Sequence, residues 1–219
     1  MPFDSNRKIL FIHIPKTGGT SIEQYFDLCH AENFWYDRWD RDRLDFVKNH
    51  HAKCNSPKLA YEPQHYTPEI LKALLDGYDD YFKFTFVRNP YTRLLSEYYW
   101  RENKKYASPE DFDPVKFDSW TDAWLSDLND SHKEPQVNYI DPSLDFIGRF
   151  EQIEVDFAKV LLLLTKKQTG PFKLTLKALP NYNSTGIQKS EIIPHLLERT
   201  KKRIKQSYFH DFEKFNYDF

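Results

Sequence analysis

The chain has 219 residues, of which 17% are aromatic and 29% are charged, and its formal net charge is −2. This length suits one domain with a sizeable core, and the absence of a basic surplus argues against bulk binding of nucleic acid, although it does not forbid a local basic cleft. No N-terminal segment resembles a signal peptide and no apolar run approaches a membrane span, so we expect a cytoplasmic protein. The two cysteines, Cys29 and Cys54, lack metal-ligand spacing, and we expect them to be reduced thiols.

Strand-like and helix-like patterns alternate along the chain, which predicts an α/β fold with a parallel sheet flanked by helices. The expected strands are 8–14, 81–87 and 145–150. The expected helices are 20–29, 68–75, one that begins at 90, 115–128, 153–166 and 189–206, the last basic, amphipathic and packed on the sheet. We expect one domain over 1–219, with irregular substrate-side insertions near 29–64 and 104–114.

A candidate anion-binding loop follows the first expected strand. Glycine lets a backbone pass close to an anion and point its N–H groups at it, and the chain places Gly18 beside Gly19. The N-terminus of the next helix and the charge of Lys16 add attraction for an anion. The pattern predicts a phosphate-binding loop made of Lys16, Thr17, Gly18, Gly19, Thr20 and Ser21. The alternative is an ordinary strand-to-helix turn capped by hydroxyl side chains.

A second candidate phosphate contact follows the strand 81–87. Arg88 comes at its carboxyl end, where ligands bind in open α/β sheets, and Asn89-Pro90 suits a helix start. Ser96 lies about two turns into that helix, on a face that can look back toward Arg88. A guanidinium and a hydroxyl would clamp a second phosphate. Alternatively, Arg88 forms a structural ion pair and Ser96 is a surface residue.

Both segments resemble motifs of one enzyme family. In the nucleotide-triphosphatase loop G-x-x-x-x-G-K-[ST] the lysine follows the glycines, whereas here Lys16 precedes them. The order Pro-Lys-Thr-Gly-Gly-Thr-Ser resembles the 5′-phosphosulfate loop of sulfotransferases that use 3′-phosphoadenosine 5′-phosphosulfate (PAPS). Arg88, Asn89-Pro90 and Ser96 resemble the 3′-phosphate motif of that family. Weaker similarities continue almost to the chain's end, at 132–136, 147–151, 179–184 and 208–215.

The chain is similar to the group that contains the heparan and chondroitin sulfotransferases and many short bacterial relatives. This resemblance implies a P-loop-like sheet, PAPS as donor, adenosine 3′,5′-bisphosphate as product and no metal. It implies a glycan or other hydroxyl-bearing acceptor, although the sequence identifies neither the acceptor nor the oligomeric state. Asn183, Ser184 and Lys189 are expected in a late loop that closes over the nucleotide. The alternative for this loop is a cap of the last helix.

An acceptor hydroxyl must lose its proton as it attacks, and His65 occupies a place that resembles the catalytic histidine of the heparan 2-O-sulfotransferase branch. Lys16 and His65 are therefore the expected catalytic residues. Glu62 is the rival base, and the alternative for His65 is a hydrogen bond without a catalytic role. His132 and Gln136 are weaker candidates for substrate contacts. Trp35 and Trp39 are candidates for sugar stacking, whereas the spacing of Trp120 and Trp124 favours packing.

Two other functions stay open from the residues alone. One is a nucleotide-dependent kinase on the related P-loop scaffold, which would need Mg²⁺ and ATP. The other is a binding module that kept the nucleotide site without turnover. The position of Lys16 before the glycines argues against the kinase, and the presence of Lys16, Arg88, Ser96 and His65 together argues against the inactive module.

Overall fold

The computed structural model describes residues 2–28, 54, 56–102, 109–126, 130–167, 179 and 189–218. The chain forms two compact units, each of which consists of two segments of the sequence. The first unit contains Met1–Val87 and Asn138–Pro180, and the second contains Arg88–Val137 and Asn181–Phe219.

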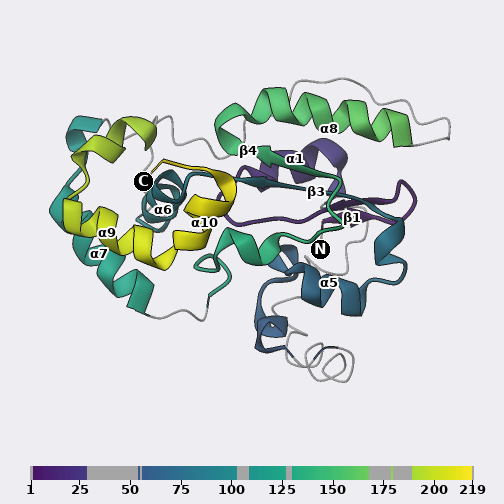
Figure 1. The fold of residues 1–219 in the computed structure, drawn as a ribbon, viewed down its shortest axis with the longest axis horizontal. Helices are drawn as coiled ribbons and strands as arrows, with labels where there is room; N and C mark the ends of the chain where they lie inside the picture. The colour runs from purple at the N-terminus through teal and green to yellow at the C-terminus, as the bar shows by residue number, and fades with distance from the viewer. Residues whose placement is uncertain are drawn as a thin grey trace. The chain divides into compact units, whose positions relative to one another are not determined.

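The first unit contains a four-stranded sheet in the order β1-β2-β3-β4 (Figure 1). Its strands are β1 (Phe3–Asp4), β2 (Ile9–Phe11), β3 (Phe82–Val87) and β4 (Phe146–Arg149). Strands β2, β3 and β4 are parallel, whereas β1 pairs antiparallel with β2. The predicted α/β class with a parallel sheet flanked by helices is confirmed. Strand β1 was not predicted, because two residues are too few to show a strand period.

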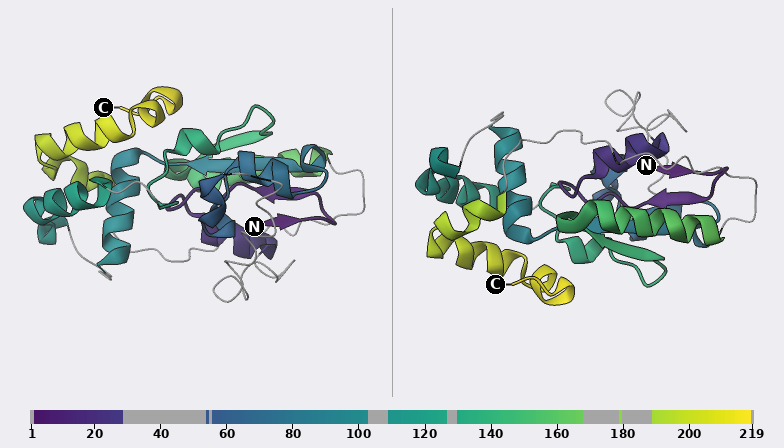
Figure 2. Two further views of the ribbon diagram at one scale, coloured as in Figure 1. Left: turned by 90° about the horizontal axis from the view of Figure 1, so that it is seen from below. Right: turned by 90° about the horizontal axis from the view of Figure 1, so that it is seen from above.

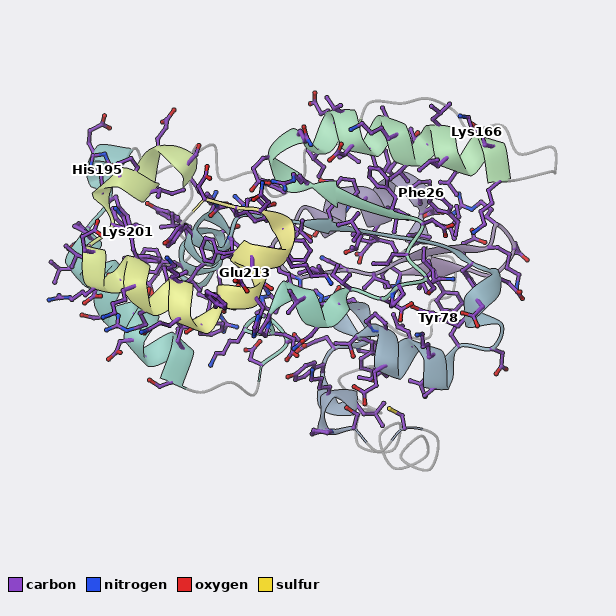
Figure 3. The ribbon with its side chains drawn as sticks, viewed as in Figure 1. Phe26, Tyr78, Lys166, His195, Lys201 and Glu213 are labelled. Carbon is purple, nitrogen blue, oxygen red and sulfur yellow. The ribbon has the colours of Figure 1, made fainter. Side chains whose placement is uncertain are left out.

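Aromatic side chains form the core of this unit. All six residues of β3 are buried, as expected for a strand covered on both faces. Helices α1 (Gly19–Phe26) and α8 (Ile153–Lys167) contribute Phe26, which is labelled in Figure 3, and Phe157. The centroids of these two rings are 5.6 Å apart, and both rings belong to one core cluster with the strand side chains. Helix α5 (Pro68–Leu74) lies on the opposite side of the sheet from α8 (Figures 1 and 2).

Short 3₁₀-helices connect these elements. In the first unit they are η1 (Pro57–Ala60), η2 (Pro63–His65), η3 (Tyr78–Asp80) and η6 (Phe150–Gln152). The element η5 (Gln136–Tyr139) includes the residues at which the chain passes from the second unit back to the first. Most of the expected insertion 29–64 lies outside the described residues, as does 103–108 of the other. The domain bounds 1–219 and the substrate-side role of both insertions stay predictions.

The second unit is helical. It contains α6 (Pro90–Arg101), η4 (Pro109–Asp111), α7 (Pro114–Ser126), η7 (Lys189–His195), α9 (Glu198–Ser207) and α10 (Phe209–Phe215). The Asp118 carboxylate on α7 accepts hydrogen bonds from Thr200 at 2.5 Å, Arg199 at 2.7 Å and Arg203 at 3.0 Å, which joins α7 to α9. Burial raises the pKa of Asp118, but these hydrogen bonds outweigh burial and hold it below its ordinary value.

The prediction of one helix over 189–206 is wrong. The segment forms η7 and then α9, with Leu197 in an extended conformation between them. Pro194 lies inside η7 and has no N–H to continue a helical ladder, which explains the break. Helix α9 packs on α6, α7 and α10. Among the described residues, we find no helix with the length and apolar character needed to cross a membrane.

We predict that Phe84→Ala lowers the free energy of unfolding by about 3–5 kcal/mol, because a buried aromatic ring is lost from a packed core. Phe84 is 0% exposed, and its ring centroid lies 5.1 Å from that of Phe11 and 5.9 Å from that of Phe26. The control is Leu162→Ala on α8, where the side chain is 56% exposed and the expected change is within about 0.5 kcal/mol. Denaturant unfolding measures both, and equal effects would contradict this description of the core.

Candidate functional site

The loop between β2 and α1 has an unusual backbone. Lys16 and Gly18 both adopt the left-handed conformation, with φ of 67° and 89°. Such a φ is uncommon for a residue other than glycine, and it persists only where the surrounding structure imposes it. The Thr17 hydroxyl donates to the carbonyl of Ile14 at 2.8 Å, and the N–H of Ser21 donates to the carbonyl of Gly18 at 3.2 Å. These contacts hold the bend at the point where α1 begins.

The predicted phosphate-binding residues differ in their exposure. Lys16, Gly18 and Thr20 are partly exposed, whereas Thr17, Gly19 and Ser21 are buried. Because the Thr17 hydroxyl is engaged with Ile14, its side chain closes the loop, and a contact with an anion would come from its backbone N–H. Helix α1 has no acidic residue in its first turn, so its N-terminus keeps the partial positive charge that attracts an anion.

Neither glycine of the loop has room for a side chain. A Cβ on Gly19 would lie 2.0 Å from Nε2 of His13, and one on Gly18 would lie 2.8 Å from Cδ1 of Ile153 and 3.2 Å from the Phe150 ring. Gly18 also has the left-handed φ that favours glycine. Packing on both sides of the loop therefore explains why two glycines are adjacent.

The histidine against Gly19 is held by a buried carboxylate. Nδ1 of His13 lies 2.6 Å from Oε1 of Glu23, and both side chains are nearly inaccessible to solvent. The His13 ring also stacks on Phe11 of β2 at 5.5 Å. This pair connects the end of β2 to α1 across the loop. Glu23 was not among the predicted site residues; the signal for it in the sequence is a charged residue beside the inward-facing Ile22 and near Phe26.

His65 lies next to the same loop. It is buried at the end of η2, its Nδ1 lies 3.2 Å from the carbonyl oxygen of His13, and the two imidazole rings are 4.6 Å apart. A carbonyl oxygen only accepts, so Nδ1 is the donor in this contact, and in the neutral ring the lone pair that can accept a proton is then on Nε2. Glu62, the rival base, is partly buried and precedes η2.

The predicted cap after β3 is confirmed in the second unit. The side chain of Asn89 accepts a hydrogen bond from the N–H of Tyr91 at 2.9 Å, and α6 begins at Pro90. Arg88 is 6% exposed, and its Nε donates to Oγ1 of Thr92 at 3.0 Å. Ser96 is partly buried on the same helix. The bond to Thr92 restrains the plane of the Arg88 guanidinium, which is the group that binds phosphate oxygens in pairs.

Gln136 is fully buried and contacts the Arg88 backbone. Its Oε1 accepts from the N–H of Arg88, and its Nε2 donates to the carbonyl of Arg88, both at 2.8 Å. Asp211 accepts from the Gln136 N–H at 2.9 Å and from Nε2 at 3.3 Å. The side-chain amide is thus engaged with protein groups at both ends. The structure gives Gln136 a role in support of Arg88, and a direct substrate contact stays a prediction that this geometry does not favour.

His132, the other candidate substrate contact, is paired with a buried acid. Its Nδ1 lies 2.8 Å from Oε2 of Glu97, and Glu97 also accepts from Nε of Arg101 at 2.6 Å. The imidazole stacks on Trp100, with ring centroids 5.6 Å apart, and Trp100 is 56% exposed. The Arg101 guanidinium lies 5.5 Å from the same Trp100 ring, and a substrate contact of His132 stays a prediction.

The other predicted residues are placed as follows. Trp120 stacks between Phe117 and Trp124 at 5.9 Å and 5.4 Å, which confirms that these tryptophans pack with neighbouring rings. Lys189 is buried at the start of η7, which packs on α6. The predictions for Asn183, Ser184, Trp35 and Trp39 fall outside the described residues. Across the described parts of the chain, no cluster of three or more His, Cys, Asp or Glu side chains is placed to hold a metal ion.

Comparison with known proteins identifies one family. The family model described as "Sulfotransferase family" matches residues 2–218 of the chain. No curated protein and no solved structure matches it.

We predict that Gly19→Ala destabilises the protein by about 1–3 kcal/mol, the usual cost of inserting a methyl group into a packed site. The new Cβ would meet the His13 ring, which its bond to Glu23 holds in place. Thr20→Ala, at a partly exposed neighbouring position, is the control. In a double-mutant cycle, His13→Ala should reduce the cost of Gly19→Ala, since it removes the ring. A cost that is the same in both backgrounds would show that His13 does not limit the space at Gly19.

Proposed function

Because the chain belongs to the sulfotransferase family, we propose that it transfers the sulfuryl group of PAPS to a hydroxyl of a carbohydrate-containing acceptor. The observation that carries this proposal is the loop at the start of α1, in which a left-handed Lys16 precedes two adjacent glycines that have no room for a side chain. The lysine before the glycines matches the order of the 5′-phosphosulfate loop.

The loop would bind the 5′-phosphate of the donor. Sulfuryl transfer leaves extra negative charge on this phosphate, so a cation that contacts it binds the transition state more tightly than the ground state. Lys16 supplies a full charge, and the N–H groups at the start of α1 supply partial charges. Gly18, Gly19, Thr20 and Ser21 would contribute backbone N–H or hydroxyl donors, and Thr17 its N–H.

The 3′-phosphate would be held by residues of α6 and its surroundings. Arg88 immediately precedes the cap of α6, and its guanidinium is restrained through Nε by Thr92. Ser96 lies further along α6, and Lys189 begins the η7 segment that packs on α6. An arginine fork, a hydroxyl and an ammonium are the donors that bind phosphate in proteins.

His65 is proposed as the general base. Its Nε2 would take the proton of the acceptor hydroxyl while the acceptor oxygen forms a bond to sulfur. The bond between sulfur and the bridging oxygen breaks, and its electron pair stays on the 5′-phosphate. The contact of Nδ1 with the His13 carbonyl, which lies beside the loop, supports a tautomer with the lone pair on Nε2. Glu62 stays the alternative base, and His132 with its stacked Trp100 is the proposed acceptor contact.

Lys16→Ala is expected to abolish transfer and to weaken the affinity for adenosine 3′,5′-bisphosphate about 10- to 100-fold, the range for losing one charge-assisted hydrogen bond. Titration calorimetry measures the affinity, and transfer of labelled sulfate to a panel of glycans measures activity. Lys166→Ala removes the same charge from an exposed position on α8 and should change neither quantity. Unaltered transfer by Lys16→Ala would remove its central role.

His65→Ala is expected to lower kcat by about 10²-fold or more and to leave nucleotide affinity nearly unchanged, since a general base acts on the acceptor. His65→Asn is the matched variant, because its amide can still donate to the His13 carbonyl but cannot accept a proton at neutral pH. If His65→Asn keeps wild-type turnover, His65 is not the base. If nucleotide affinity collapses in both variants, His65 contacts the donor instead.

A further inference from the structure

One side chain holds both backbone polar groups of Arg88. Gln136 lies 48 residues further along the chain, and its amide pairs with the N–H and the carbonyl of Arg88 at 2.8 Å each. A strand neighbour would make the same pair of contacts, so Arg88 is held as if the strand pairing continued by one residue. The backbone position of Arg88 determines where its side chain begins. Thr92 restrains the guanidinium at the other end of that side chain, through Nε.

Gln136 is held in turn by an acid on the last helix. Asp211 accepts from the N–H of Gln136 at 2.9 Å, from its Nε2 at 3.3 Å and, through the other carboxylate oxygen, from the N–H of Val137 at 2.9 Å. Gln136 and Asp211 are both 0% exposed. A buried amide can rotate or lose its partners only at the cost of an unsatisfied polar group, so this chain of contacts acts as a unit.

The buried position of Asp211 disfavours the charged form of its carboxylate. Burial raises the pKa of Asp211, while Arg93 and the three N–H contacts act in the opposite direction. Helix α10 also packs on the start of α6, where the rings of Phe212 and Tyr91 are 5.0 Å apart. The last helix therefore meets the segment around Arg88 through both an apolar contact and a polar one.

We propose that Asp211, acting through Gln136, is a positioning residue for Arg88 and thereby sets the preference of the protein for nucleotides that carry a 3′-phosphate. This inference rests on the proposed function, in which Arg88 contacts that phosphate. Asp211 does not contact the nucleotide; it fixes the side chain that fixes the Arg88 backbone. Its loss should reduce binding of the 3′-phosphate and leave binding of the 5′-phosphate unchanged.

The test is titration calorimetry with two probes, adenosine 3′,5′-bisphosphate and adenosine 5′-monophosphate, on the wild type and Asp211→Asn. Asparagine keeps the shape of the side chain, but its NH₂ group cannot accept the N–H that the lost oxygen accepted. We expect affinity for the bisphosphate to fall about tenfold or more and affinity for the monophosphate to change less than about twofold, as for the loss of one positioned charge-assisted contact.

Asp118→Asn is the matched control. Asp118 is also buried in the second unit and also accepts three hydrogen bonds, but these come from α9 and not from Gln136. It should lower stability without changing the ratio of the two affinities. A purely structural role for Asp211 predicts the same behaviour in both variants, so the affinity ratio separates positioning from general stability.

The outcomes distinguish the inference from the function on which it rests. A wild type that prefers the bisphosphate, with an equally selective Asp211→Asn, overturns the inference alone. A wild type that binds the two probes equally overturns the 3′-phosphate role of Arg88 and the inference with it. Should Asp211→Asn not fold, Gln136→Met removes the amide at similar volume; loss of the preference in that variant supports the inference, and retention overturns it.

Discussion

The space around Gly18 and Gly19 is the constraint on which the candidate site depends. One glycine is covered by Ile153 and Phe150, and the other by the ring of His13, so the loop backbone is enclosed by side chains on both sides. Glu23 holds the covering histidine from within α1. An anion-binding loop works only if its N–H groups are already in place when the anion arrives, because ordering them afterwards would cost free energy. In the candidate loop, the core of the first unit and one buried pair hold the backbone in place.

Buried polar contacts support the second candidate segment in a comparable way. Arg88 depends on Gln136, and Gln136 depends on Asp211, 75 residues further along the chain. Such contacts stabilise little on balance, but they are costly to break and so select one arrangement of the backbone. His65 follows the same principle on a smaller scale, since the carbonyl of His13 selects its tautomer. Long-range backbone contacts thus place or orient Arg88 and His65.

The sequence predicted the elements whose signals are local. The buried strand β3, the Asn89 cap and the loop around Gly18 and Gly19 follow from alternation, capping chemistry and glycine, and the family is confirmed over residues 2–218. The contacts of Gln136 were not predictable, because nothing in the local pattern marks an amide as the partner of a distant backbone. The pair of His13 and Glu23 was missed for the same reason. The break near Pro194 was predictable from the sequence, because proline cannot continue a helical ladder. The expectation of a single helix over 189–206 did not take this proline into account.

The most direct measurement of the central claim is calorimetric titration of the wild-type protein with adenosine 3′,5′-bisphosphate and, separately, with ATP and Mg²⁺. If both candidate segments bind phosphate as proposed, the bisphosphate binds one to one without a divalent metal and more tightly than ATP with Mg²⁺. Tight binding of ATP with Mg²⁺ and no binding of the bisphosphate would contradict the assignment of both segments.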